Sequence, residues 1–552
     1  MPDYESVRWD TSLKNKYKLT FIRGRIMQTP YELFTKNFVA SVNSNIFLEP
    51  TAKIYPLQTG GGKSHYQNTE MPVDLKAAFP DLKYIIRLSP TREVSDDGTF
   101  KKVKQLGKFR YLSDPGPEVL DVTEDNEEIV YCISITHTYF LSNFDRLFKY
   151  AQDSVLCIEE AHQFVGCADE GRGAYLINSG YSSEYTAETW KRIKEWMEIN
   201  PRVIGFTATP TEHQKGNELL SPNKYEVIGD LVPLKDILPH QKWLNKVNNP
   251  YHYQKNNGAP SIRAAVENSI DVLIERELKL EKLLLKDPNI NPKLAGYYVC
   301  GDFRGVWGCP IDEVRNIMSE YLLSIGFDES TQMIATMVES GNTVWNLNGE
   351  GEKVENASDV FDRLEDPNDP VRFLLVINRG RSGINVHNFT VNVVCRIRDP
   401  KEIRTPIPIQ IFGRNVRINV GTGSIIRDKY QNNIGKYLAN YSDDYGIHPQ
   451  TVIETIKVSN IFDIWYPENP KAKRTWQDSL DEFKEKYVNS AEDGYEFLYN
   501  QTGVQKPPII EFLPLPLTIT RECNGEMVEY DVSKEIENWV GDGTLNPFFN
   551  IQ

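Results

Sequence analysis

A glycine-rich segment near the N-terminus, Leu57-Gln58-Thr59-Gly60-Gly61-Gly62-Lys63-Ser64, has the composition of a phosphate-binding loop. It directly follows a short apolar run, which predicts a buried strand. Three glycines let the backbone approach a phosphate and turn its N–H groups toward it. Lys63 would add a positive charge at the β- and γ-phosphates, and the Ser64 hydroxyl would bind Mg²⁺. The segment predicts an ATP site, although Leu57 stands where the full pattern has glycine, and an ordinary glycine-rich turn is the alternative.

Two adjacent carboxylates, Glu159 and Glu160, end the apolar run Val155–Ile158. Such a pair suits nucleotide hydrolysis because one carboxylate can hold Mg²⁺ while the other activates water. Thr207 and Thr209 end a further predicted strand, and their hydroxyls can hydrogen-bond neighbouring carboxylates. Taken alone, the glutamate pair is more typical of a solvated strand end and the threonine segment of an ordinary Thr-Pro turn, so the prediction depends on their order along the chain.

Two segments rich in arginine lie in the second half of the chain, at residues 377–385 (INRGRSGIN) and 410–417 (QIFGRNVR). Arg414 and Arg417 are three positions apart, which predicts that they share one face of a helix. Two arginines on one face can contact the γ-phosphate of a nucleotide that another domain binds. A solvated basic helix face is the alternative interpretation of this second segment.

In their order these segments resemble the motifs of superfamily 2 helicases and translocases of the DExH type. The matching segments, from motif I to motif VI, are TGGGKS (59–64), SPTRE (89–93), EEAH (159–162), TATP (207–210), INRGRSGIN (377–385) and QIFGRNVR (410–417). The resemblance covers roughly residues 20–420. Its loose motif V is more similar to type III restriction motors and phage helicases than to DEAD-box RNA helicases.

The resemblance implies a role for each residue at a motif position. The residues implied in ATP binding are Gln28, Thr59, Gly60, Gly61, Gly62, Lys63, Ser64 and Gly383. Those implied in catalysis are Lys63, Glu160, Gln410, Arg414 and Arg417, and those implied in holding Mg²⁺ are Ser64 and Glu159. Those implied in nucleic-acid contact are Thr91, Arg92, Thr136, Arg379 and Arg381, and those implied in coupling are His162, Thr207 and Thr209.

Two positions depart from the family pattern. Glu159 stands where the family has aspartate, and its additional methylene would shift the metal by about 1 Å, a displacement that could slow the chemistry. Asn385 stands where motif V commonly carries an acidic residue, so the ribose or coupling role of that position stays open. Neither departure bears on the fold.

The elements that must position these residues are short apolar runs, which predict strands buried on both faces of parallel sheets. The runs are 53–57, 84–88, 130–135, 155–158 and 203–206, followed by 294–300, 332–338, 373–377 and 391–397. This pattern predicts an α/β protein with two parallel sheets, and the resemblance implies that both domains are RecA-like. A mixed, partly helical C-terminal domain follows. The predicted parts are 1–215 with motifs I, Ia, II and III, 216–290 as a connection or insertion with a helix over 261–285, 291–428 with motifs V and VI, and 429–552 as an accessory domain.

Composition bounds the function further. The chain has 552 residues, 11% of them aromatic, and a net charge of −15, which excludes a mainly disordered chain and argues against a wholesale nucleic-acid coat. Basic residues nevertheless outnumber acidic ones between residues 372 and 427, as a groove that follows a phosphate backbone requires. No apolar stretch is long enough for a membrane span, and the N-terminus lacks a signal peptide. Seven isolated cysteines predict thiols in a reducing compartment, so we expect a cytoplasmic protein (in the host cell if viral) without a membrane partner.

The leading interpretation is an ATP-dependent nucleic-acid helicase or translocase that uses ATP and Mg²⁺ in the cleft between two lobes, with DNA favoured over RNA. A packaging or nuclease-coupled ATPase, or the motor subunit of a restriction complex, is the first alternative, although a packaging motor does not require the QxxGRxxR segment. An ATP-gated switch that clamps nucleic acid without moving along it is the second alternative, and Glu159 in place of aspartate favours it. A slow turnover without movement would distinguish the switch.

Residues 429–552 are the least informative part of the sequence. Their aromatic residues could stack on bases but are more typical of a core, namely Tyr430, Tyr437, Tyr441, Tyr445, Trp465 and Tyr466. The acidic run Asp478–Glu485 predicts a solvated helix, which could also face a basic partner. We expect this segment to set substrate choice or to recruit a protein partner.

Overall fold

The computed structural model of the chain contains two compact units, residues 1–504 and residues 505–552. It describes residues 30–44, 47–56, 63–90, 109–113, 115, 129–161, 164–165, 183–207, 224–229, 232, 241–248, 251–252, 258–284, 292–301, 308–338, 340–377, 384, 386–396, 407–417, 449–468, 476–488, 490–502, 518–523 and 526–531. None of the helices in these ranges combines the length and the apolar character that crossing a membrane demands.

The first sheet has seven strands in the order β3-β4-β2-β5-β6-β1-β7, and every neighbouring pair is parallel. The strands are β1 (Ala52–Pro56), β2 (Tyr84–Ser89), β3 (Phe109–Ser113), β4 (Val130–Thr136), β5 (Ser154–Ile158), β6 (Val203–Thr207) and β7 (Tyr225–Val227). Five of them, β1, β2, β4, β5 and β6, confirm the strands predicted from apolar runs in this part of the chain.

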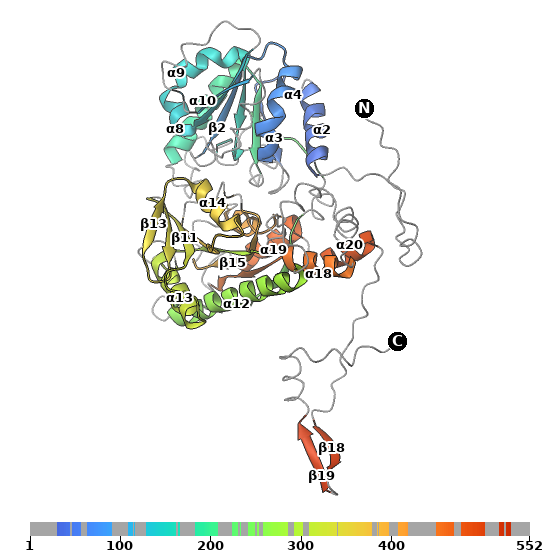
Figure 1. Ribbon diagram of the computed structural model, residues 1–552. Coiled ribbons are helices and arrows are strands. Elements are labelled where there is room, and N and C mark those ends of the chain that lie inside the picture. The colour runs from blue at the N-terminus through green and yellow to red at the C-terminus, as the bar shows by residue number, and fades with distance from the viewer. Residues whose placement is uncertain are drawn as a thin grey trace. The chain divides into compact units, whose positions relative to one another are not determined.

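Helices cover both faces of the first sheet, as a parallel sheet requires. The helices are α2 (Pro30–Asn43), α3 (Lys63–Thr69), α4 (Met71–Ala78), α8 (His137–Ser142), α9 (Phe144–Leu147) and α10 (Ser183–Ile199), with the 3₁₀ helix η1 at Phe148–Asp153. Figure 1 shows α2, α3 and α4 beside one face and α8, α9 and α10 beside the other. Successive residues of a strand alternate between the two cores, because Ile54 belongs to the same core as Trp190 whereas Tyr55 belongs to the same core as Phe38. We call this sheet and its helices the first lobe.

The second sheet has eight strands in the order β13-β12-β11-β14-β10-β15-β16-β8. The strands are β8 (Trp243–Val247), β10 (Ala295–Val299), β11 (Gln332–Val338), β12 (Gly341–Asn346), β13 (Gly351–Val354), β14 (Phe373–Val376), β15 (Phe389–Val394) and β16 (Ile461–Trp465). Pairing is parallel from β11 to β8, and the hairpin β12–β13 adds an antiparallel edge. The predicted strands β10, β11, β14 and β15 are confirmed, and with them the α/β class with two parallel-stranded sheets.

The second sheet extends beyond the range 291–428 in both directions along the sequence. β8 belongs to the predicted connection 216–290, and β16 belongs to the segment 429–552. The sequence expectation that strands end near residue 428 therefore differs from the structure. The apolar run of β16 is interrupted by Asp463, which hid the strand, and this buried carboxylate pairs with Arg276 at 2.8 Å.

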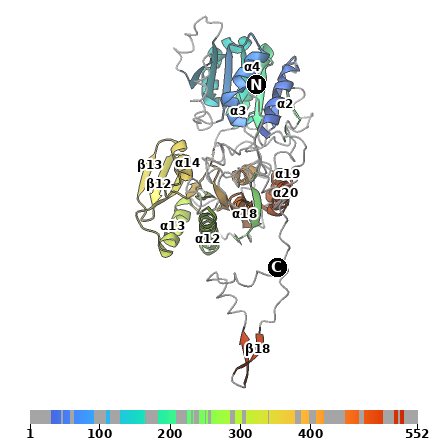
Figure 2. The same ribbon diagram turned by 45° about the vertical axis from the view of Figure 1, so that its right-hand side comes forward.

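The helices of the second sheet also divide between its two faces. They are α12 (Gly258–Leu284), α13 (Ile311–Ser324), α14 (Ala357–Glu365), α15 (Ile407–Gly413), α18 (Pro449–Ser459), α19 (Trp476–Tyr487) and α20 (Ala491–Thr502). Residues of α12, α13 and α18 share one core, and residues of α14, α15 and α19 share the other. Figure 2 shows α12 and α18 beside each other below this sheet. The predicted helix over 261–285 is confirmed as α12, and we call this sheet and its helices the second lobe.

Short strands complete the described chain. β9 (Tyr251–His252) pairs with β17 (Pro467–Glu468), and β18 (Thr518–Cys523) forms an antiparallel hairpin with β19 (Glu526–Asp531) in the second unit. Two aromatic residues of the C-terminal segment, Trp465 and Tyr466, are buried in the second lobe, so the core interpretation is confirmed for them. The other aromatic residues named from that segment, Tyr430, Tyr437, Tyr441 and Tyr445, lie outside the described residues.

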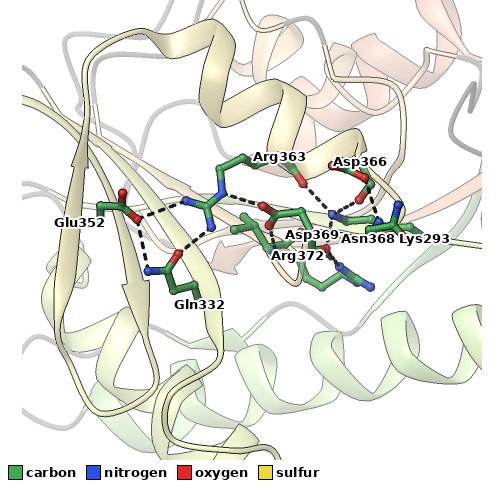
Figure 3. A network of polar contacts seen from close by, with 9 residues as sticks. Lys293, Gln332, Glu352, Arg363, Asp366, Asn368, Asp369 and Arg372 are labelled. Atoms are coloured by element: carbon green, nitrogen blue, oxygen red, sulfur yellow. Dashed lines mark hydrogen bonds and ion pairs between the residues drawn. The ribbon is translucent and has the colours of Figure 1, made fainter.

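A network of polar contacts lies at the end of the second sheet where β10 and β14 begin (Figure 3). The Lys293 ammonium donates to the main-chain carbonyls of Arg363, Asp366 and Asp369 at 2.6, 2.7 and 2.7 Å. Arg363 also pairs with the Asp369 carboxylate at 2.8 Å, and Arg372 pairs with Glu277 at 2.9 Å. The network holds the turn between α14 and β14, so it lies at the opposite end of β14 from the segment 377–385.

Candidate nucleotide site

Four neighbouring strands of the first lobe, β2, β5, β6 and β1, end at one edge of the sheet. Their parallel register pairs Leu88 with Ile158, Ile158 with Gly205, and Pro56 with Thr207. The residues that follow these strands are therefore neighbours in space, since the carboxyl ends of parallel strands meet at one edge, where open α/β sheets bind their ligands. The segments that resemble motifs Ia, II, III and I lie at or after the ends of β2, β5, β6 and β1, in that order across the sheet.

The predicted phosphate loop lies between β1 and α3. Helix α3 begins at Lys63, whose side chain is partly buried, and residues 57–62 lie outside the described part of the chain. The order strand, glycine-rich segment, helix is the context that a phosphate-binding loop requires. Ser64 is the second residue of α3, and its side chain is also outside the described residues.

Glu159 is buried at the end of β5, and its carboxylate has partners on β2. Arg87 donates from Nη2 to Oε1 in an ion pair, and Ser89 donates from Oγ to Oε2 at 3.1 Å. The main-chain N–H of Glu159 donates to the carbonyl of Leu88 at 2.8 Å. Arg87 and Ser89 are two residues apart, so they point to the same face of the strand. Sequence reasoning missed Arg87, although a single arginine within an apolar run signals a buried charge that needs a carboxylate.

Glu160 has a backbone conformation that glycine normally adopts. Its φ of +48° is the single positive value at a non-glycine residue in the described ranges. The turn continues into Ala161, which packs so closely on β6 that a Cβ at position 205 would lie 2.8 Å from the Ala161 Cβ. Gly205 therefore allows this close approach, and the turn 159–161 is fixed between β2 and β6.

The carboxylate of Glu159 fits a cation site of the kind that Mg²⁺ uses. Each of its oxygens accepts one hydrogen bond from the protein, so a further lone pair on each oxygen is left for a ligand. Mg²⁺ is commonly bound through one or two carboxylates together with waters and substrate phosphates. Among the described residues no group of three or more His, Cys, Asp or Glu side chains forms a metal-binding cluster, so an all-protein cage is not formed there.

The other described first-lobe residues with predicted roles have structural partners. The Thr207 side chain is fully buried at the end of β6. The Thr136 hydroxyl, predicted to contact nucleic acid, accepts from the Tyr139 N–H at 3.2 Å and caps α8. His137 contacts the Pro90 carbonyl through Nδ1 at 3.0 Å, and burial lowers the pKa of this imidazole. His137 thus anchors the residue that directly precedes the predicted contacts Thr91 and Arg92.

In the second lobe, the prediction that Arg414 and Arg417 share a helix face is wrong. α15 ends at Gly413, residues 414–416 form a turn, and Arg417 forms an isolated bridge with Gln241. Glycine has low helix propensity and is favoured where helices end, which accounts for the early stop. The two arginines still converge, because both donate from Nη1 to the Ile384 carbonyl, at 3.3 and 2.6 Å.

The Arg414 guanidinium is buried, and its electrostatic environment involves both lobes. Burial lowers the pKa of Arg414, while the neighbouring Tyr297 and Glu160 act in the opposite direction. Ile384 lies within the segment 377–385, so the shared carbonyl connects this segment to the segment 410–417. Gln410 is partly buried on α15.

Asn392, in the middle of β15, is a second residue that sequence reasoning missed. Its side-chain NH₂ donates to the Ile411 carbonyl and to the Asn415 Oδ1, both at 2.9 Å. It therefore fastens the end of α15 and the turn that carries Arg414 to the sheet. An asparagine within the apolar run FTVNVV is the signal that could have identified it, because a buried amide needs partners.

Many of the predicted site residues lie outside the described residues and stay predictions. They are Gln28, Thr59, Gly60, Gly61, Gly62, Thr91, Arg92, His162, Thr209, Arg379, Arg381 and Gly383.

No protein-family model and no curated protein matches this chain. Solved structures that resemble it include the ATP-dependent Type ISP restriction-modification enzyme LlaBIII bound to DNA, at 10% identity and a TM-score of 0.41, covering 87% of this chain and 33% of that one. The Mycobacterium smegmatis helicase Lhr bound to ssDNA and AMP-PNP has 12% identity, a TM-score of 0.43 and coverages of 84% and 51%. S. cerevisiae Dbp5 bound to RNA and ADP BeF3 has 13% identity, a TM-score of 0.41 and coverages of 86% and 97%.

This chain thus spans a third of the length of the restriction-modification enzyme and half of the length of Lhr. Resemblance at this distance assigns no activity. The fold and the described residues define an α/β protein with two large sheets, and four neighbouring strands of its first lobe end at one edge, where open α/β sheets bind their ligands.

Proposed function

We propose that this chain is an ATP-dependent nucleic-acid helicase or translocase that hydrolyses ATP with Mg²⁺ between its two α/β lobes. The observation that carries the proposal is the edge of the first sheet, where Lys63, Glu159, Glu160 and Thr207 follow or end adjacent parallel strands. A phosphate-binding lysine beside a carboxylate pair is the arrangement that ATP hydrolysis requires. Alternate closure and release of two lobes would move the protein along a strand.

In this proposal the residues of the first lobe divide the chemistry. Lys63 and Ser64 bind the phosphates and the cation, Glu159 holds Mg²⁺, and Glu160 orients or deprotonates the attacking water. Bound Mg²⁺ would neutralise charge on the phosphates. Residues 59–62 and Gly383 contribute to nucleotide binding, and Gln28 recognises the base.

From the second lobe, Gln410, Arg414 and Arg417 would approach the γ-phosphate. The shared contact of both arginines with the Ile384 carbonyl supports this, since it gives the two guanidinium groups a common orientation. His162, Thr207 and Thr209 would couple the nucleotide state to nucleic acid.

Nucleic acid would contact the chain through Thr91, Arg92, Thr136, Arg379 and Arg381. We propose DNA as the preferred polymer, a protein partner for residues 429–552, and a cytoplasmic location. The excess of basic residues between positions 372 and 427 supports a phosphate-binding surface in an otherwise acidic chain.

The test is the rate of ATP hydrolysis without polymer and with single-stranded DNA, duplex DNA, forked DNA and RNA. We expect strong stimulation by one polymer, and its loss in Lys63→Ala. Lys83→Ala is the matched control, because Lys83 is half-exposed in the same lobe, before β2 rather than at the site edge. Hydrolysis that no polymer stimulates, or that Lys63→Ala retains, would contradict the proposal.

A second candidate is an ATP-gated switch that clamps nucleic acid without moving along it. The observation that favours it is Glu159 in place of aspartate, with its carboxylate in an ion pair with Arg87. Displacement of streptavidin from biotinylated DNA distinguishes the two candidates. A motor displaces streptavidin as it hydrolyses ATP, whereas a switch binds the DNA and leaves streptavidin in place.

A further inference from the structure

Arg87 is a buried charge in the centre of the first sheet. Its side chain is 6% exposed and that of its partner Glu159 is 4% exposed, and both neighbouring strands of β2 are parallel. A buried charge is costly unless it is paired and hydrogen-bonded. Arg87 therefore needs its carboxylate partner, and that partner lies at the end of β5, directly before Glu160 in the candidate site.

Three contacts from β2 determine where Glu159 lies. Arg87 and Ser89 each donate a hydrogen bond to one oxygen of the Glu159 carboxylate. The main-chain N–H of Glu159 donates to the Leu88 carbonyl. The next residue, Glu160, has a φ of +48°. A non-glycine residue persists in this region when the surrounding structure over-determines it, and such strain is concentrated at functional sites.

We infer that Arg87 is a positioning residue for ATP hydrolysis: its buried ion pair with Glu159 holds the strained turn that presents the Glu160 carboxylate. The inference rests on the proposed function. It also gives a structural reason for glutamate at position 159, because this side chain contacts both Arg87 and Ser89 and aspartate is one methylene shorter. In this inference the additional methylene of Glu159 extends its carboxylate toward the Arg87 guanidinium, with which it forms an ion pair.

Stability alone does not account for the pair. Buried ion pairs can often be replaced by apolar residues of similar size without loss of stability. A positioning role instead predicts that removal of the guanidinium impairs the chemical step while the nucleotide still binds, since Lys63 and the glycine-rich segment are unchanged.

The experiment compares Arg87→Met, Arg87→Lys, Ser89→Ala, Glu159→Gln and the double variant Arg87→Met/Glu159→Gln. For each, kcat and KM for ATP are measured, together with the affinity for a fluorescent ATP analogue. We expect Arg87→Met to lower kcat about 100-fold, the scale of a displacement of about 1 Å, without change in nucleotide affinity. Arg87→Lys and Ser89→Ala should lower kcat less, because each retains part of the contact. The double variant should be no slower than the slower single variant, since the two residues act as a unit.

Arg202→Met is the matched control. Arg202 pairs with Asp81 at 2.9 Å in the same lobe, before β6 and β2 rather than after them. We expect wild-type kcat for this variant.

A wild-type rate in Arg87→Met, or equal losses in kcat and nucleotide affinity, would overturn the inference. Additive losses in the double variant would do the same. If Arg87→Met does not fold, Ser89→Ala decides: lower kcat with unchanged affinity supports the inference, and unchanged kcat overturns it. Failure of the proposed function is distinguishable, because the wild-type protein would then not hydrolyse ATP with any polymer.

Discussion

At the residue scale, the buried polar groups of this chain gather where motif segments must be held in place. Glu159 is fixed from β2, and both arginines of the segment 410–417 share the Ile384 carbonyl. Asn392 fixes the segment that carries these arginines. Since a buried polar group without partners is costly, these contacts define one arrangement for each segment.

The strained conformation of Glu160 leads to a stability prediction. Glu160→Gly and Glu160→Ala both remove the carboxylate and should both abolish hydrolysis. Glycine adopts positive φ without cost whereas alanine does not, so Glu160→Gly should be more stable than Glu160→Ala by about 1 kcal/mol. Unfolding in urea measures the difference. Equal stability of the two variants would show that the turn relaxes when the carboxylate is absent.

Asn392 leads to a prediction about the second lobe. Asn392→Leu removes both donors and leaves the Ile411 carbonyl and the Asn415 side chain without these bonds, so the variant should lose about 2 kcal/mol of stability. Hydrolysis should also fall, because the turn that holds Arg414 is no longer fastened to β15. Asn316→Ala is the control, since Asn316 is exposed on α13 of the same lobe. A stable Asn392→Leu protein with unchanged turnover would contradict this.

The types of most candidate site residues stand out in the sequence, but their contacts could not be predicted. Lys63, Glu159 and Glu160 are recognisable because side-chain chemistry and strand ends coincide. The Ile384 carbonyl has no sequence signal at all, since every residue carries such a group. The end of α15 at Gly413 was missed because the arginine spacing alone suits a helix, whereas Asn415, held by Asn392, favours the turn.

At the element scale, most strands were predictable from mainly apolar runs, including β2 with its Arg87 and β15 with its Asn392, whereas β8 and β16 were not. β16 contains Asp463, and β8 contains Asn245, which donates to the same carboxylate at 2.9 Å. These polar residues become acceptable only because segments far apart in sequence meet, which no local pattern reveals. The hairpin β12–β13 did carry a signal, since Asn348 and Gly349 form the dipeptide typical of tight turns, and Gly349 has a φ of +92°.

Helix α19 supports α15, which leads to a prediction at the same scale. Its Trp476 is 2% exposed and packs edge-on against Phe412 of α15, with ring centroids 5.8 Å apart. The indole N–H donates to the Arg396 carbonyl at 3.2 Å. The acidic run predicted as a solvated helix is thus a helix whose apolar side is buried.

Trp476→Ala should lower stability by about 3–5 kcal/mol, as expected for a large aromatic residue removed from a core. Trp476→Phe should lose only about 1 kcal/mol, since packing is largely kept and one hydrogen bond is lost. Thermal unfolding measures both, and Lys484→Ala, at an exposed position of α19, is the control. Equal effects of the two tryptophan variants would assign the role of Trp476 to its N–H rather than to its ring.

At the scale of the whole molecule, the second lobe contains the predicted domain 291–428 together with segments that precede and follow it in the sequence. In the strand order β15-β16-β8, the strand from residues 461–465 lies between one strand of the predicted domain and one from residues 243–247. Removing β16 would therefore expose the edge of β15 and leave β8 without its only partner strand in the described sheet. Residues 505–552, in contrast, form a compact unit of their own.

Two truncations test this division. The chain 1–504 keeps every described strand of both large sheets, so it should fold with an unfolding midpoint and a basal ATP hydrolysis rate equal to those of the full chain. The chain 1–428 ends at the boundary that the sequence suggests but lacks β16, α18 and α19, so it should be insoluble or should lose the cooperative unfolding of its second lobe. Solubility, circular dichroism and thermal unfolding of the two proteins provide the comparison. A stable, cooperatively folded 1–428 chain would mean that β16 is an addition to a complete lobe, whereas its loss of folding would place the limit of that lobe beyond residue 428, in the part of the chain that contains β16.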